Sequence, residues 1–139
     1  GANESAGPAG WLWRLARLKT GALFAASVRC GALVGGAGPE ELAALTSFGE
    51  NIGLAFQIID DLLDKDQDRR VSPRRTCGER NFNLHDASVP MSFGELPDLA
   101  SVKAQARDLT RSALEAIEFL GSRGDMLRAL ICELLERTD

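Results

Sequence analysis

Three aspartates and a glutamine lie close together in an otherwise apolar stretch of this chain. The aspartates are Asp60, Asp61 and Asp64, at relative positions i, i+1 and i+4. On a helix that turns by about 100° per residue, these carboxylates and the amide of Gln57 fall within one arc of roughly 100°. Hard oxygen ligands at this spacing, able to share one or two ions, suit Mg²⁺. The pattern therefore predicts a metal site.

Apolar side chains occupy much of the remaining surface of the same helix. They are Phe56, Ile58, Ile59, Leu62 and Leu63. We therefore expect most of this helix to be buried. Buried carboxylates repel one another strongly unless they are compensated, so a positive charge is expected beside them. The alternative is a solvated acidic face on a surface helix, which the apolar flanks and the co-facial glutamine count against.

The overall composition is that of an ordinary globular domain. The chain has 139 residues, of which 45% are hydrophobic and 26% charged, and its formal net charge is −4. This length fits one domain, and the acidic balance argues against a nucleic-acid partner. The cysteines are widely spaced and three in number, which suggests neither a zinc finger nor a disulfide framework. A cytoplasmic location is the simplest expectation.

Hydrophobic periodicity of about 3.6 residues predicts an all-α chain, without clear strand alternation. We expect a tail or linker over residues 1–10 and one helical domain over residues 11–139. The predicted helices run from Trp11 to about Leu33, from Pro39 to near Asp68, from Asp98 or Ser101 to Leu120, and from about Met126 to Leu135. The second of these either continues through Gly53 or restarts there. The small, apolar residues after Gly21 are expected to form a buried helix. Arg29 interrupts them, which argues against a membrane span.

Two motifs resemble those of trans-isoprenyl diphosphate synthases. One is the pair Lys19-Thr20, and the other is the sequence Phe-Gln-x-x-Asp-Asp-x-x-Asp that begins at Phe56. In that family the second aspartate-rich motif follows a Lys-Thr pair at a similar interval, and here 38 residues separate Lys19 from Gln57. The resemblance covers about residues 11–139. It implies a helical bundle of the isoprenoid synthase type, of which this chain would form the C-terminal half.

The resemblance also implies an activity and its residues. The enzyme would be a Mg²⁺-dependent prenyltransferase of isoprenoid biosynthesis, which joins an allylic diphosphate to isopentenyl diphosphate and releases pyrophosphate. The implied metal ligands are Asp60, Asp61 and Asp64. Lys19 would add a positive charge beside the departing diphosphate. Thr20 and Gln57 would line the cavity that shields the allylic carbocation from water.

Basic residues after the acidic motif would complete the diphosphate site by the same resemblance. Arg74 takes the place of one of them, with Arg75 beside it. A second basic residue usually precedes a Ser/Thr-Phe/Tyr step, to which Arg80-Asn81-Phe82 is the nearest equivalent. The implied diphosphate ligands are therefore Lys19, Arg74 and Arg80. Solvated arginines in a charged loop are the alternative interpretation.

One expected part of the family pattern has no counterpart here. Nothing in residues 1–18 resembles the first aspartate-rich motif, which in the family supplies the other Mg²⁺ ligands. The chain would then be a fragment, a homo-oligomer or subunit completed by a second polypeptide that carries that motif, or a relative without catalysis. Two alternatives stay open: a regulatory or structural subunit with this fold, and a class I terpene cyclase. The pairing of the Lys-Thr and acidic motifs disfavours the cyclase.

Overall fold

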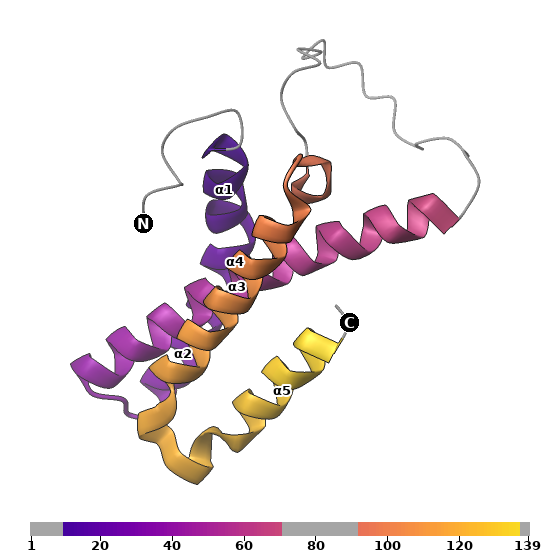
Figure 1. Ribbon diagram of the computed structural model, residues 1–139. Coiled ribbons are helices and arrows are strands. Elements are labelled where there is room, and N and C mark those ends of the chain that lie inside the picture. The colour runs from indigo at the N-terminus through magenta and orange to yellow at the C-terminus, as the bar shows by residue number, and fades with distance from the viewer. Residues whose placement is uncertain (1–9, 71–91, 137–139) are drawn as a thin grey trace.

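The computed structural model describes residues 10–70 and 92–136, and within these ranges the chain is helical and contains no strand (Figure 1). The elements in order are α1 (Gly10–Ala16), η1 (Arg17–Gly21), α2 (Ala22–Val34), α3 (Pro39–Arg70), η2 (Phe93–Glu95), α4 (Leu99–Ala116), η3 (Glu118–Gly124) and α5 (Asp125–Glu136). The predicted all-α class is confirmed. Residues 1–9 lie outside the described ranges, so the division into a tail and a domain stays a prediction.

The first predicted helix is continuous but not regular. Its central turn, η1, is a π-helix, and the helix ends where Gly36 adopts a φ of 78°. A residue with a side chain rarely adopts that backbone conformation, so a glycine ends the helix there. The following helix begins at Pro39 as predicted, and Glu41 accepts a hydrogen bond from the backbone nitrogen of Gly38 at 2.9 Å. This contact caps the first turn of α3.

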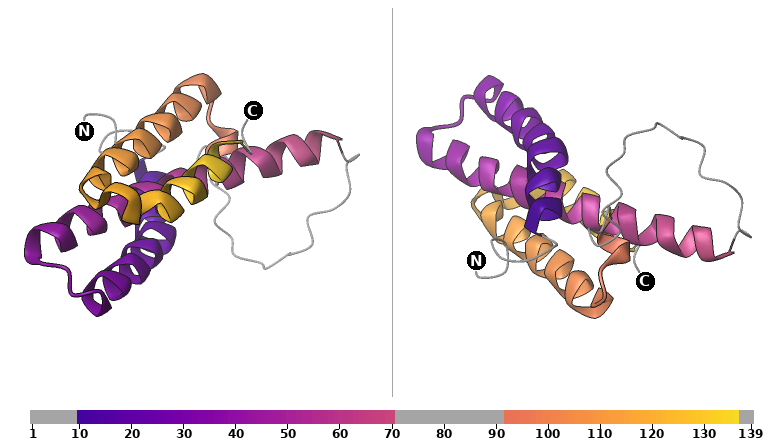
Figure 2. Two further views of the ribbon diagram at one scale, coloured as in Figure 1. Left: turned by 90° about the horizontal axis from the view of Figure 1, so that it is seen from below. Right: turned by 90° about the horizontal axis from the view of Figure 1, so that it is seen from above.

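The long helix α3 forms the centre of the molecule. Helices α2 and α4 pack against opposite sides of it, as both views of Figure 2 show. The core side chains come mainly from α3, among them Phe48, Ile58 and Ile59, and are joined by residues of α1, α4 and α5 and by Phe93 of η2 and Ile117 after α4. Within the described residues, the stretch Pro39–Asp64 is long and apolar enough to cross a membrane, but half of its most apolar window is buried. That degree of burial is usual for the central helix of a bundle.

Glycines allow the first helical run to cross α3 at very short distance. A Cβ atom at Gly49 would lie 2.7 Å from the Cα atom of Ala25, and one at Gly53 would lie 2.9 Å from the Cα atom of Gly21. Both distances are shorter than real Cβ contacts, so larger residues would force the backbones apart. This crossing fixes η1 beside the middle of α3.

The second half of the described chain forms a helical hairpin. Asp98 caps α4 by accepting a hydrogen bond from the backbone nitrogen of Ser101 at 3.0 Å, which confirms one of the two predicted caps. The predicted break between the last two helices is also confirmed, because Gly121 has φ 53° and ψ −134°. These dihedral angles are accessible almost only to glycine.

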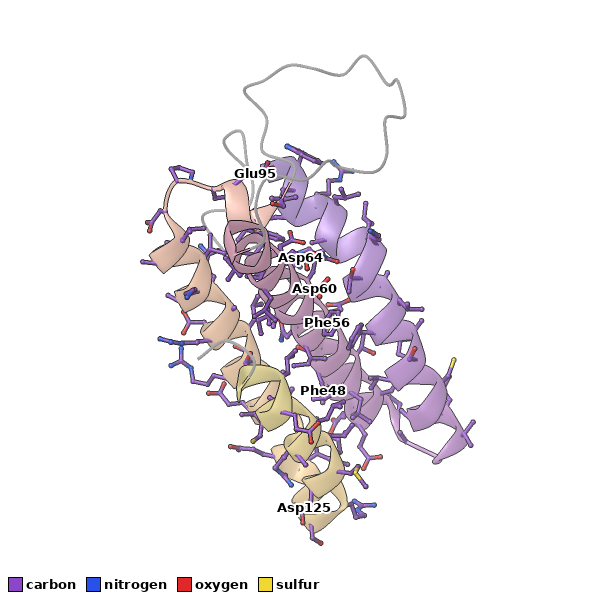
Figure 3. All side chains as sticks on the ribbon, turned by 90° about the vertical axis from the view of Figure 1, so that its right-hand side faces the viewer. Phe48, Phe56, Asp60, Asp64, Glu95 and Asp125 are labelled. Atoms are coloured by element: carbon purple, nitrogen blue, oxygen red, sulfur yellow. The ribbon has the colours of Figure 1, made fainter. Side chains whose placement is uncertain are left out.

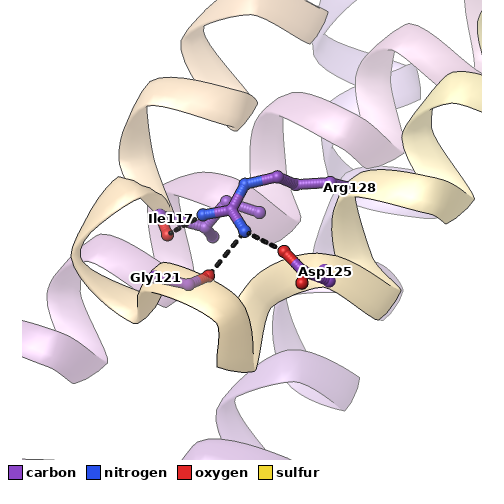
Figure 4. A network of polar contacts seen from close by, with 4 residues as sticks. All are labelled: Ile117, Gly121, Asp125 and Arg128. Carbon is purple, nitrogen blue, oxygen red and sulfur yellow. Dashed lines mark hydrogen bonds and ion pairs between the residues drawn. The ribbon is translucent and has the colours of Figure 1, made fainter.

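Arg128 of α5 holds the hairpin turn closed (Figure 4). Its guanidinium donates to the carbonyl oxygen of Gly121 at 2.6 Å and to that of Ile117 at 3.4 Å, and it pairs with Asp125 at 2.9 Å. The last carbonyls of a helix have no partner within the helix. One side chain therefore bonds to the residue that follows α4 and to Gly121 of η3, and ties this turn to α5.

The expectation that α2 is a buried helix is wrong. Ala25 is buried on the side that meets α3, whereas Leu23, Leu33 and Val34 are exposed by 66%, 59% and 92%. The small apolar residues of α2 serve one close crossing, and no described element covers the rest of the helix. The last helix behaves similarly, because Ile131 and Leu134 are buried but Met126 and Leu130 are exposed.

Candidate functional site

The acidic motif lies on α3 beyond the crossing with the first helical run. Asp60 and Asp64 follow Phe56 along one side of α3 (Figure 3), as their spacing of four residues requires. Asp60 and Asp64 are exposed and Asp61 is half-buried. The apolar half of the helix is buried as predicted, at Ile58, Ile59 and Leu62. The expectation of a buried carboxylate edge is therefore wrong for Asp60 and Asp64, which face away from that core.

A chain of hydrogen bonds links the Lys-Thr pair to the acidic motif. The hydroxyl of Thr20 donates to Oε1 of Gln57 at 2.6 Å, and Nε2 of Gln57 donates to Oδ1 of Asp61 at 2.9 Å. An ionised carboxylate can only accept, so Asp61 sets the orientation of the amide, and the amide in turn receives the threonine proton. The two predicted motifs, 37 residues apart at this contact, thus form one site.

Local irregularity in the first helical run helps to make this contact. Lys19 and Thr20 lie within the π-helical turn η1, a form that is rare and that occurs often at functional sites. Thr20 faces α3 and is half-buried, whereas the side chain of Lys19 is exposed. Three residues of α3 at intervals of four meet the first helical run in order: Gly49 lies against Ala25 of α2, Gly53 against Gly21 of η1, and Gln57 bonds to Thr20 of η1. Asp61 follows one turn later and is joined to this run through Gln57.

A backbone group that the sequence did not indicate completes the surroundings of Asp61. The backbone nitrogen of Phe93 donates to Oδ2 of Asp61 at 3.0 Å, so each carboxylate oxygen accepts a hydrogen bond from a described residue. The ring of Phe93 is fully buried and meets Trp13 of α1 edge to face, with 4.7 Å between the ring centroids.

One signal for Phe93 was present in the sequence. Ser92-Phe93 is a Ser-Phe step, the kind that follows a basic residue in the family pattern, whereas Asn81-Phe82 lacks the hydroxyl residue. Met91 precedes this step, so the expected basic residue is not in that place.

The three aspartates fit a hard divalent cation by their donor chemistry. Each carboxylate has about four acceptor positions, so the two hydrogen bonds on Asp61 leave both of its oxygens able to bind an ion. Among the described residues no three acidic, histidine or cysteine side chains converge to hold a metal ion. Mg²⁺ in phosphate-transfer sites is commonly held by one or two carboxylates together with substrate phosphates. Such a site needs no preformed cluster of three.

The predicted arginine ligands lie outside the described ranges. Arg74, Arg75 and Arg80 lie between residues 71 and 91, outside the part of the chain that the structure describes. Their assignment to the substrate diphosphate stays a prediction. Of the other predicted residues, Thr20, Gln57 and Asp61 are directly linked, and Lys19, Asp60 and Asp64 are their exposed neighbours in the sequence.

Comparison with known proteins gives a consistent family. The family model described as polyprenyl synthetase matches residues 11–79. A short chain isoprenyl diphosphate synthase of Methanothermobacter thermautotrophicus is 38% identical over 119 residues, which are 86% of this chain and 33% of that protein. The farnesyl diphosphate synthase of Escherichia coli is 35% identical over 130 residues, which are 91% of this chain and 42% of that protein.

A third relative is more similar in sequence. The geranylgeranyl diphosphate synthase of Cyanophora paradoxa is 54% identical over 124 residues, which are 87% of this chain and 38% of that protein. The chain thus spans between a third and about two fifths of the length of these relatives. The matched family model includes both the Lys-Thr pair and the acidic motif, which the structure joins through Gln57. Over the part that it spans, the chain belongs to the polyprenyl synthetase family.

Proposed function

We propose that this chain supplies the Lys-Thr and acidic half of a Mg²⁺-dependent prenyltransferase site. The reaction joins an allylic diphosphate to isopentenyl diphosphate. The bond between the allylic carbon and the diphosphate oxygen breaks, pyrophosphate leaves with the electron pair, and the isopentenyl double bond attacks the resulting cation before a proton is lost. The observation that carries this proposal is the continuous link from Thr20 through Gln57 to Asp61.

The described residues suit distinct parts of this reaction. Asp60 and Asp64 are exposed carboxylates, so a cation that accompanies a diphosphate has open access to them. Bound Mg²⁺ would neutralise charge on the leaving pyrophosphate. The side chain of Lys19 is exposed beside the linked residues and would hold the same anion by its positive charge. The Thr20 hydroxyl donates a hydrogen bond to Gln57. The lone pairs of the Thr20 oxygen therefore stay free to face an electron-poor carbon.

Relatives favour chain-elongating prenyl transfer over terpene cyclisation. The three proteins compared above are named as prenyl diphosphate synthases, and none of those three is named as a cyclase. Because the chain spans less than half of each, we propose that a second polypeptide segment carries the first aspartate-rich motif. The absence of a disulfide-type cysteine pattern supports a cytoplasmic enzyme.

Incorporation of radiolabelled isopentenyl diphosphate tests this function directly. Two proteins are assayed with an allylic diphosphate and Mg²⁺. One is this chain by itself. The other is this chain fused to the C-terminal end of the part of the Escherichia coli farnesyl diphosphate synthase that it does not match. We expect prenyl products from the fusion. Replacement of Asp61 by Ala in the fusion should lower the rate by about 100-fold or more, because the metal-binding carboxylate and its contacts are lost together.

A matched variant separates loss of chemistry from loss of folding. Glu115 is an exposed carboxylate on α4, so Glu115→Gln removes a similar charge away from the acidic motif and should keep the rate of the unmodified fusion. A folded fusion that forms no product with any allylic diphosphate would contradict the proposal. That outcome would instead favour a structural or regulatory subunit with the same fold.

A further inference from the structure

We propose that the segment Ser92–Leu96 is a positioning element for the acidic site, through the backbone nitrogen of Phe93. Phe93 packs against Trp13, and its N–H holds the carboxylate of Asp61 in the orientation that receives a divalent cation. Binding of the cation and seating of this segment then stabilise one another. The inference rests on the proposed function, because it concerns the same carboxylates.

The segment is held in place independently of Asp61. The Phe93 side chain is fully buried, the ring of Trp13 is 8% exposed, and both belong to the main hydrophobic core. The two rings meet at an interplanar angle of 68°, a preferred geometry for aromatic pairs. Burial of the ring and two backbone hydrogen bonds of the η2 turn, from Glu95 to Ser92 at 3.1 Å and from Leu96 to Phe93 at 3.2 Å, together determine where the backbone nitrogen of Phe93 lies. The two backbone bonds do not depend on the ring.

The carboxylate of Asp61 is held from two separate directions. Gln57 binds Oδ1 from the same helix, and Phe93 binds Oδ2 from a segment 32 positions later in the chain. A carboxylate with one donor on each oxygen cannot rotate about its terminal bond without breaking a contact. Hydrogen-bond partners of this kind orient metal-binding side chains, and their loss commonly weakens metal affinity by about 10- to 100-fold.

Cation binding and the positioning of Phe93 are coupled because both involve the carboxylate of Asp61. A cation that binds Asp61 better when Phe93 is seated must, by linkage, favour the seated state of Phe93 to the same extent. Binding of a cation at Asp61 on α3 would thus stabilise the position of Phe93 in the segment that precedes α4.

A pair of substitutions at one position isolates the backbone N–H. Phe93→Ala and Phe93→Pro both remove the ring, but only proline also removes the donor. Proline suits this place, because Ser92 is extended at φ −144° and ψ 158° and residue 93 is the first of a 3₁₀-helix. Mn²⁺ is titrated into each purified variant and into the unmodified chain, and free Mn²⁺ is measured by electron paramagnetic resonance. We expect about tenfold weaker Mn²⁺ binding for the proline variant than for the alanine variant.

A second measurement uses the unmodified chain and needs no variant to fold. Amide hydrogen exchange of Phe93 is followed by nuclear magnetic resonance as Mg²⁺ is added. The amide of Ala37, which bonds to the carbonyl of Ala32 at 2.9 Å in the turn after α2, serves as the control. We expect exchange at Phe93 to slow severalfold and exchange at Ala37 to stay unchanged.

Each outcome separates this inference from the proposed function. Cation binding with equal affinity in the two Phe93 variants and with no slowing at the Phe93 amide would overturn the inference and leave the function standing. A difference between the variants, together with no prenyl product from the fusion, would support the inference and overturn the function. An unmodified chain that binds neither Mn²⁺ nor Mg²⁺ would overturn the inference and the metal site together.

Discussion

Gln57 uses both ends of its amide to join two helices. Its oxygen accepts from Thr20 and its nitrogen donates to Asp61, so the orientation of one planar group depends on a hydroxyl and a carboxylate together. Such chains of polar groups are sensitive to the loss of any one member, because the remaining partners are left partly unsatisfied. The threonine can be tested with little change in shape, because valine differs from it only by a methyl group in place of the hydroxyl.

Replacement of Thr20 by valine is expected to destabilise the chain modestly. Valine keeps the shape of threonine but leaves Oε1 of Gln57 without its donor, which should lower the free energy of unfolding by about 1 kcal/mol. Thr20→Ser keeps the hydroxyl and should stay within about 0.5 kcal/mol of the unmodified chain. Urea denaturation followed by circular dichroism measures both values. Equal stability of the valine variant and the unmodified chain would show that this hydrogen bond contributes nothing.

At the scale of elements, the closeness of the crossing between α2 and α3 brings the site together. Gly49 and Gly53 let the two backbones approach, and Gln57, one turn beyond Gly53 on α3, then reaches Thr20 of η1. A wider crossing would leave Thr20 too far from Gln57 for a hydrogen bond. Small residues in the structural core of the molecule thus determine contacts in the site.

An alanine at Gly49 should therefore destabilise the chain. Its Cβ atom would lie 2.7 Å from a backbone atom of Ala25, and backbone cannot move aside cheaply, so we expect a loss of about 2–3 kcal/mol in the free energy of unfolding. Gly31→Ala is the matched control, because Gly31 is an exposed residue of α2 with nothing within 4 Å of an added Cβ atom.

The control substitution should have the opposite sign. Alanine favours a helix interior over glycine by about 0.5–1 kcal/mol, so Gly31→Ala should raise the free energy of unfolding. Thermal and urea denaturation of the two variants side by side give the comparison. Stabilisation by both alanines would show that the backbones of α2 and α3 do not approach closely at Gly49.

Local signals explain how much of the architecture could be predicted from the sequence. Pro39 and Asp98 mark helix starts through their own backbone and side-chain chemistry, and the structure confirms both. The sequence left open whether the helix continues or restarts near Gly53, and in the structure α3 continues through it, with the glycine in close contact with the first helical run. The π-helical turn η1 also has no sequence signature that separates it from an ordinary helical turn.

The contacts of the site also fall into those that the sequence motifs indicated and those that they did not. The link between Thr20 and Gln57 agrees with the resemblance that placed both residues in one cavity, whereas the donor from Phe93 depends on the path of the chain across 32 positions. A backbone N–H has no identity in the sequence, so periodicity and motifs could not reveal it. The exposure of Asp60 and Asp64 was missed because apolar neighbours on a helix bury only the face on which they lie.

At the scale of the whole molecule, large apolar side chains remain exposed on two sides. Leu18, Leu23 and Val34 lie along η1 and α2, and Met126 and Leu130 lie on α5. On a helix Leu23 and Val34 are about 20° apart, so they form one face of α2. Exposed apolar faces of this kind favour association in water.

We therefore expect the isolated chain to self-associate through α2. Sedimentation at micromolar concentration should give a mass above the 14.9 kDa of one chain. The double substitution Leu23→Gln and Val34→Gln should return it towards that mass, because burial of two exposed apolar residues no longer favours the complex. The pair Met126→Gln and Leu130→Gln on α5 is the matched control. A monomeric unmodified chain, or dissociation by the α5 pair alone, would contradict this interface.

The π-helical turn also sets the rotational phase between α1 and α2. Removal of one residue from Arg17–Gly21 would turn α1 about its own axis by about 100° relative to α2. Leu12 and Trp13, which are buried in the structure, would turn towards solvent. The contact between the rings of Trp13 and Phe93 would be lost. A single-codon deletion 35 to 39 positions before the start of the acidic motif at Phe56 would thereby disturb the hydrogen bond from Phe93 to Asp61, so the number of residues in this turn is itself a constraint on the site.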